Sequence, residues 1–249
     1  MYIHVLKRNK MKTELHKANT RGHADHGWLN SYHTFSFAGY HDPSRMHFGA
    51  LRVLNDDTVK GGMGFGKHPH DNMEIVSIPL FGDLHHKDST GRDKIIRQHD
   101  VQIMSAGSGI THSETNANHD KEVKFLQIWV IPKEHNITPR YDQKSFLPED
   151  RLNKILTVVA PDDANAVWIN QDAWFSLANL SKDFSSDYKV QKKDNGVYAF
   201  VIKGDVTING IALNERDGLG ISETDLLNIT ANSDAELLLI DVPMEINKN

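Results

Sequence analysis

Two short pieces of the sequence concentrate side chains that bind metal ions. They are His68-Pro69-His70 and, further along the chain, His112-Ser113-Glu114. All 15 histidines lie between residues 4 and 135 and the chain has no cysteine, so a metal would be bound by imidazole, carboxylate and water. Three neutral nitrogens and one anionic oxygen suit Fe, Ni, Cu, Mn or Zn, and these ligands alone do not select one metal.

The spacing of these residues matters because side chains two apart in a strand project to the same face. His68 and His70 are therefore expected to point together, and so are His112 and Glu114. If the two strands face each other across a barrel interior, the four groups converge on one ion and leave one or two positions open, as in catalytic metal sites. Glu74 shares the parity of His68 and His70, which makes it a candidate ligand or hydrogen-bond partner of a ligand.

The other histidines are interpreted as surface or packing residues. A single His-x-His pair is weak evidence, but a second metal-binding pair in a similar glycine-rich β context favours a metal site. His85 and His86 lie in a polar segment that is typical of an exposed hairpin tip. His33 and His41 are assigned to packing in preference to a pocket wall.

The elements that would position these groups are short β-type runs separated by Gly, Asn and Asp. They cover residues 50–54, 73–78, 101–104, 124–131, 197–208 and 236–243. Asn209-Gly210 predicts a two-residue hairpin turn. Helical patterning is confined to one short turn near residues 147–154, and residues 132–161 are predicted to connect two halves. The pattern indicates an all-β sandwich or barrel.

Length and composition are those of an ordinary globular protein. The 249 residues allow two compact halves, 39% of them are apolar, and the formal net charge is -5. The acidic balance argues against direct nucleic-acid binding, and no run approaches the length of a membrane helix. The first residues lack the apolar core of a secretory signal, so we expect a cytoplasmic protein with residues 1–10 as a loose tail; Met11 is an alternative start.

At this point a family resemblance becomes specific. Gly62, His68-Pro69-His70 and Glu74 are spaced as in the first cupin motif, and the chain resembles the pirin family, in particular its bacterial quercetinase-like branch. The stretches that carry the resemblance are residues 21–29, 33–37, 49–57, 68–74, 102–114 and 127–129, with a weaker likeness through residues 204–243.

The resemblance implies a bicupin, two antiparallel jelly-roll barrels in tandem with few short helices. Residues 1–140 would form a metal-binding barrel and residues 141–249 a degenerate barrel without metal, which agrees with the absence of histidine after His135. The implied ligands are His68, His70, His112 and Glu114. By the same resemblance Glu74 is not a direct ligand, and it is kept as a candidate hydrogen-bond partner of a ligand.

The implied activity is that of a dioxygenase that opens the central ring of flavonols such as quercetin with O2, with Fe(II) as the expected metal. Glu114 would accept the proton of the flavonol 3-hydroxyl. Four apolar residues are candidates for the substrate pocket: Phe65, Met73, Phe125 and Trp129.

Two other functions stay open. The first is a non-catalytic, metal-bearing regulator that binds a partner protein, as eukaryotic pirins resemble transcriptional cofactors. The second is a cupin enzyme that acts on another small molecule, such as a sugar isomerase with zinc. That activity would call for cationic groups aimed at phosphate, and Lys67 alone supports it.

Overall fold

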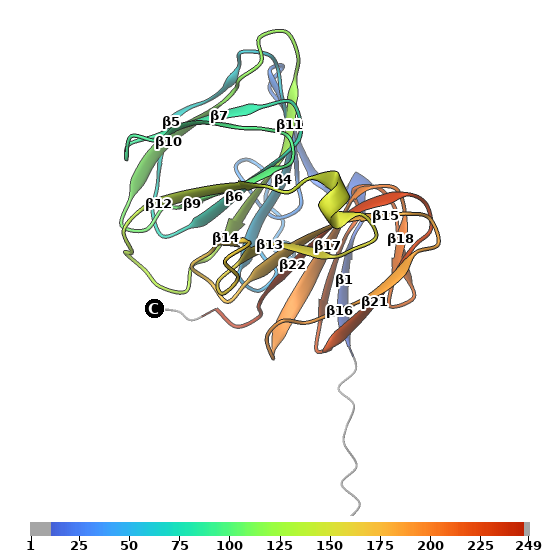
Figure 1. Ribbon diagram of the computed structural model, residues 1–249. Coiled ribbons are helices and arrows are strands. Elements are labelled where there is room, and N and C mark those ends of the chain that lie inside the picture. The colour runs from blue at the N-terminus through green and yellow to red at the C-terminus, as the bar shows by residue number, and fades with distance from the viewer. Residues whose placement is uncertain (1–10, 247–249) are drawn as a thin grey trace, which may run out of the picture.

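The computed structural model describes residues 11–246, and the expected tail at residues 1–10 lies outside them. The chain is all-β, as predicted, and forms two halves that each contain a seven-stranded and a four-stranded sheet (Figure 1). Pairing between named strands is antiparallel apart from one short parallel pair, β13 with β14. Two 3₁₀ helices, η1 (Ala18–Thr20) and η2 (Pro148–Arg151), are the only helices in this range.

The first half contains the residues of the predicted metal site. Its large sheet has the order β12-β9-β6-β11-β4-β3-β2 and its small sheet the order β5-β10-β7-β8. The large sheet consists of β2 (Gly22–Asp25), β3 (Leu29–His33), β4 (Leu51–Val59), β6 (Glu74–Phe81), β9 (Asp100–Ser105), β11 (Val123–Val130) and β12 (Arg140–Ser145). The small sheet consists of β5 (Gly64–His70), β7 (Leu84–Asp88), β8 (Asp93–Ile96) and β10 (Ile110–Asn116).

The second half repeats this plan. Its large sheet has the order β1-β20-β17-β22-β15-β13-β14 and its small sheet the order β16-β21-β18-β19. The large sheet consists of β1 (Lys12–His16), β13 (Leu156–Ala160), β14 (Val167–Trp168), β15 (Trp174–Leu180), β17 (Asn195–Lys203), β20 (Gly218–Ser222) and β22 (Ala235–Pro243). The small sheet consists of β16 (Ser185–Lys189), β18 (Val206–Ile208), β19 (Ile211–Leu213) and β21 (Leu226–Ala231).

The division of the chain differs from the expected one at two places. Strand β1 pairs with β20, so the first described strand lies in the second half, where Figure 1 shows it in blue among orange and red strands. Strand β12, inside the predicted connection, extends the first large sheet by pairing with β9. Both strands add to a sheet edge whose backbone groups would otherwise be unpaired, and hydrophobic periodicity carries no sign of such a pairing.

Two short sequence signals are confirmed. Asn209 and Gly210 have φ values of 49° and 82° and join Ile208 to Ile211 in the β18–β19 hairpin, as a type I′ turn requires. The predicted helical turn is η2, where the backbone N–H of Leu147 donates to the Asp150 carboxylate.

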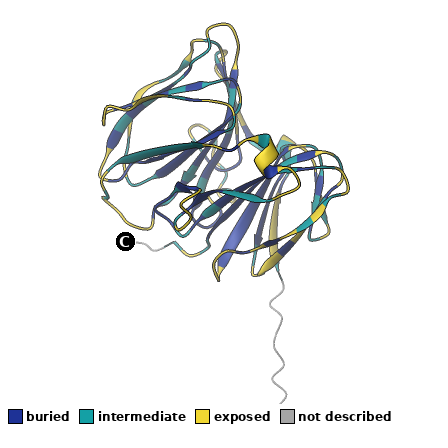
Figure 2. Ribbon diagram, in the orientation of Figure 1, coloured by how far each residue is buried: buried dark blue, intermediate teal, exposed yellow. Residues whose placement is uncertain are grey.

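The largest apolar core lies between the halves, where the two seven-stranded sheets face each other. Val76 and Ile128 from the first half belong to the same buried cluster as Phe175 and Leu238 from the second. Figure 2 shows these buried strands meeting at the centre of the molecule. A separate apolar cluster occupies the interior of the second half, whereas the first half has two smaller clusters and a polar interior. A polar site is therefore expected in the interior of the first barrel, which is not filled by apolar side chains.

Gly49 at this junction supplies a prediction about stability. It has a φ of +50°, and a Cβ there would lie 2.2 Å from the carbonyl oxygen of Pro243, which accepts the N–H of Ala50. We expect Gly49→Ala to lower the free energy of unfolding by about 2 kcal/mol or more. Alanine is strained in the left-handed conformation, and its Cβ would also overlap the backbone of Pro243. Urea denaturation measures this. Gly39→Ala, where a Cβ meets no atom within 4 Å, should shift the midpoint little, and equal shifts would contradict the argument.

Candidate metal centre

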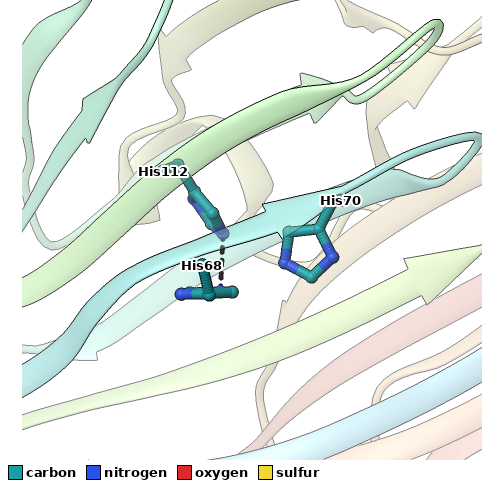
Figure 3. Close-up of side chains that lie close together, drawn as sticks. All are labelled: His68, His70 and His112. Carbon is teal, nitrogen blue, oxygen red and sulfur yellow. Dashed lines mark hydrogen bonds between the residues drawn. The ribbon is translucent and has the colours of Figure 1, made fainter.

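Three histidines converge on one point between β5 and β10. His112 lies directly opposite His68 in the antiparallel register, and His70 lies two residues further along β5 on the same face (Figure 3). Their ligand nitrogens all lie within 4.8 Å of one another, and the Nε2 atoms of His68 and His112 are 3.0 Å apart. Two nitrogens bound at right angles to one ion at ~2.1 Å would also lie ~3.0 Å apart, so the spacing fits a metal.

Hydrogen bonding orients one of these rings. The Nδ1–H of His68 donates to the carbonyl oxygen of Gly66 at 2.8 Å, which leaves Nε2 as the nitrogen with a free lone pair. A hydrogen bond of this kind is the usual way in which a protein fixes the tautomer of a metal-binding histidine. His68 therefore has the tautomer that metal binding through Nε2 requires.

Two of the three histidines, His70 and His112, are uncharged at neutral pH. Burial and the neighbouring imidazoles of His68 and His70 lower the pKa of His112 to about 2. Burial and the His68 imidazole lower the pKa of His70 to about 4. Because only neutral imidazole can donate a lone pair, these two ligands need not release a proton to bind a metal near pH 7.

Glu114 lies on the same face of β10 as His112, as the parity argument predicts. Its oxygens accept hydrogen bonds from the hydroxyl of Ser77 at 3.0 Å and the amide of Gln127 at 2.5 Å. A carboxylate oxygen lies within 4.8 Å of ligand nitrogens of His112 and His86, whereas the group that includes His68 and His70 contains no Glu114 atom. Burial raises the pKa of Glu114, an effect that a bound cation would oppose.

Glu74 lies elsewhere. Its carboxylate accepts the hydroxyl of Ser105 at 2.8 Å and the backbone N–H of Asn170 at 3.1 Å, on the face of β6 that packs against the second half. The parity argument for Glu74 was wrong because β5 ends at His70 and a turn follows, in which Asn72 has a φ of 44°. Alternation does not continue through such a turn. Glu74 joins the two halves and does not support the histidines.

His86 is the main residue that the sequence interpretation missed. We expected an exposed hairpin tip, but His86 is fully buried on β7, and its ring centroid lies 5.3 Å from that of His112. Its Nε2 contacts the Asp88 carboxylate at 2.9 Å. The turn comes later, around Gly91, whose φ is +88°. The alternation of Leu84, His86 and Asp88 as buried positions was the available signal.

A cavity of about 570 Å³ opens directly beside the triad, within the usual size range of small-molecule sites. Two of the four predicted pocket residues, Phe65 and Trp129, line it together with His68, His70 and Glu114. Met73 and Phe125 do not: each packs in an apolar cluster, Met73 alongside Trp129 and Phe125 alongside Phe65. His33, which we assigned to packing, is buried and also lines the cavity.

The cavity wall also contains a buried acid, Asp57, which accepts a hydrogen bond from Ser31. Burial raises the pKa of Asp57 to about 7, although the hydrogen bond from Ser31 acts in the opposite direction. The folded state thus binds a proton more tightly than the unfolded chain, so this group destabilises the fold progressively as pH rises from about 4 to about 7.

We therefore expect Asp57→Asn to remove this pH-dependent loss. The variant should gain stability relative to the parent protein as pH rises, by up to about 4 kcal/mol at pH 8. Urea unfolding at pH 5 and pH 8 measures the difference. A stability difference that is the same at both pH values would contradict the assignment.

Comparison with known proteins identifies the family of the chain and agrees with the fold. The family model for pirin matches residues 14–130, and the model for the quercetinase C-terminal cupin domain matches residues 157–242. The quercetin 2,3-dioxygenase of Escherichia coli strain K12 is 45% identical over 230 residues, which cover 92% of this chain and 98% of that protein. The chain belongs to the pirin family.

Other relatives extend the comparison. A pirin-like protein of Caulobacter vibrioides is 42% identical to this pirin, over 88% of this chain and 95% of its own. The crystal structure of the bacterial pirin YhhW in complex with nickel(II), from Escherichia coli, superposes with a TM-score of 0.88 at 43% identity and covers 93% of this chain and 99% of that one. A quercetin 2,3-dioxygenase of Acinetobacter baumannii, at 21% identity and a TM-score of 0.74, shares the fold.

The two family models place two cupin domains in this pirin, which confirms the predicted bicupin. Within residues 11–246, no helix combines the length and the apolar character needed to cross a membrane.

Proposed function

We propose that this pirin is a metal-dependent dioxygenase that opens the central ring of flavonols such as quercetin with O2. The observation that carries the proposal is the position of the histidine triad, of which His68 and His70 form part of the wall of a cavity large enough for an aromatic substrate. The 45% identity to a quercetin 2,3-dioxygenase supports the same activity.

The lining of the cavity favours a neutral aromatic compound. Phe37, Phe65 and Trp129 provide flat apolar surface, and Phe37 meets Trp129 edge to face with ring centroids 5.3 Å apart. No lysine or arginine of the described chain lines this cavity, and Lys67 is exposed and lies outside it. A phosphorylated sugar, the substrate that another cupin enzyme would require, has no cationic partner here.

His68, His70, His112 and Glu114 would hold one divalent metal. The solved relative with nickel(II) supports a divalent ion, and we infer Fe(II) as the metal in the cell, with Ni, Cu, Mn or Zn as alternatives. When bound, the ion would acidify a coordinated hydroxyl and make the redox chemistry of O2 accessible.

Glu114 would accept the proton of the flavonol 3-hydroxyl. Its carboxylate lines the cavity, and Ser77 and Gln127 restrict its orientation through one hydrogen bond to each oxygen. Burial raises the pKa of Glu114, which makes the ionised group a stronger base than an exposed glutamate. The residue thus combines a position in the cavity wall with suitable basicity.

The proposal is tested by the fate of the oxygen atoms. Metal-loaded protein is incubated with quercetin under ¹⁸O₂, and the mass of the product is determined by mass spectrometry. We expect a ring-opened product that contains two labelled atoms. Bound metal with no labelled product would contradict catalysis on flavonols and favour a metal-bearing regulator that binds a partner protein.

A further inference from the structure

A line of polar side chains crosses the large sheet of the first barrel beside the metal site. The residues are neighbours in register on five successive strands: His33, Asn55, Gln127, Ser77 and Gln102. All five are buried, and because directly opposed residues share a face, all belong to the same face of the sheet. Gln127 and Ser77, in the middle of the line, hydrogen-bond to Glu114, and one end of the line is His33.

The end of this line at β3 and β4 has unused hydrogen-bonding groups. Nδ1 of His33 and Oδ1 of Asn55 are buried and have no partner within residues 11–246. His33 and Asn55 face each other across the strands, as do Ser31 and Asp57 two residues further along, and all four line the cavity. A buried polar atom without a partner costs free energy, so the unpartnered atoms of His33 and Asn55 in this wall indicate a ligand that completes their hydrogen bonds.

We propose that His33, Asn55 and Asp57 form the subsite that recognises the ring hydroxyl groups of a polyphenol and thereby orients it toward the metal. This inference rests on the proposed function, because it names the groups that select among flavonols. His68, His70 and His112 on the small sheet would hold the metal to which the chelating edge of the substrate binds. The large sheet would bind its remaining hydroxyls.

The chemistry of the subsite fits neutral hydroxyl groups. An asparagine amide offers both a donor and an acceptor, and a neutral imidazole offers one of each, which matches phenolic O–H groups. Burial lowers the pKa of His33, so its imidazole is neutral at pH 7. A site built to hydrogen-bond a substrate hydroxyl discriminates strongly against an analogue that lacks it.

The test compares the binding of two ligands that share the same metal-chelating edge. Quercetin carries hydroxyls on both outer rings, and 3-hydroxyflavone carries none there. Binding to nickel-loaded protein is measured in the absence of O2 by the change in tryptophan fluorescence, since Trp129 lines the cavity. We expect the parent protein to bind quercetin more tightly by about tenfold or more, which corresponds to one or two good hydrogen bonds.

Asn55→Leu should abolish most of this preference and change the affinity for 3-hydroxyflavone by less than about threefold, since that ligand makes no hydrogen bond there. Asn55→Ala is the second variant should the larger side chain prevent folding, which thermal unfolding would show. Asn179→Leu is the matched control, because Asn179 has the same unpartnered buried Oδ1 but lies on β15, far from this cavity lining. It should retain the parental preference.

The outcomes separate the two proposals. Equal affinity of the parent protein for both ligands, or a preference unchanged in both Asn55 variants, would overturn the subsite and leave the dioxygenase intact. A preference that disappears with Asn55 in a protein that yields no labelled product would support the subsite and remove the dioxygenase. Failure to bind either ligand would contradict both.

Discussion

His112→Ala is expected to abolish metal binding and to lower quercetin turnover by more than about 100-fold. Removal of a residue that only hydrogen-bonds to a metal ligand typically costs up to about 100-fold, and loss of a ligand itself should cost more. His112 is the most buried of the three histidines and contacts both others, with ring centroids 4.4 Å from His68 and 4.9 Å from His70. Its loss would leave only two histidine ligands, both on β5, and the carboxylate of Glu114. Elemental analysis of the purified variant and quercetin absorbance measure the two effects.

His85→Ala provides the matched control. His85 lies on the adjacent strand β7, but it is partly exposed and its Nε2 contacts Asp93. This variant should retain the parental metal content and turnover. Full metal content in His112→Ala, or an equal loss in both variants, would show that the triad is not the metal site.

Glu114→Gln is expected to separate metal binding from turnover. The amide preserves the size of the side chain, and three histidines remain, so we expect the protein to keep most of its metal. Turnover should fall by about 10²- to 10⁴-fold, the usual contribution of a positioned general base, because an amide cannot accept the hydroxyl proton. Metal content per chain and the rate of quercetin loss are measured on the same sample.

Glu74→Gln makes the same chemical change at another buried carboxyl group. Glu74 is hydrogen-bonded to Ser105 and Asn170 and does not line the cavity, so turnover should stay within a few-fold of the parent. Full activity of Glu114→Gln would exclude Glu114 as the base. Equal losses in the two variants would point to a general effect of removing a buried carboxyl group.

The sequence predicts most of the geometry of the candidate metal centre because strand alternation is a local property. It places His68 beside His70 and His112 beside Glu114, and the register that brings β5 against β10 then completes the triad. The same rule fails for Glu74, because a turn at Asn72 interrupts the alternation. It was not applied to His86, whose polar neighbours were mistaken for a hairpin tip.

The cavity could be predicted only in part, because its walls come from distant strands. Phe65 and Trp129 line it, but Phe125, on the same strand as Trp129 with the same parity, is buried in the apolar cluster that includes Leu29 and lies against Phe65. The polar wall depends on the register of β3 against β4, which joins Ser31 to Asp57 and His33 to Asn55. Pairing of this kind is non-local, as is the return of β1 to the second half.

Stepwise addition of Fe(II) to metal-free protein, with quercetin-dependent O2 uptake recorded after each addition, tests the central claim most directly. One centre per chain predicts that uptake rises linearly and stops at one equivalent of metal, with one O2 consumed per quercetin lost. His112→Ala should give no rise at any ratio. Uptake that is independent of added metal, or a saturated metal site with no quercetin-dependent uptake, would contradict a catalytic metal centre in the first barrel.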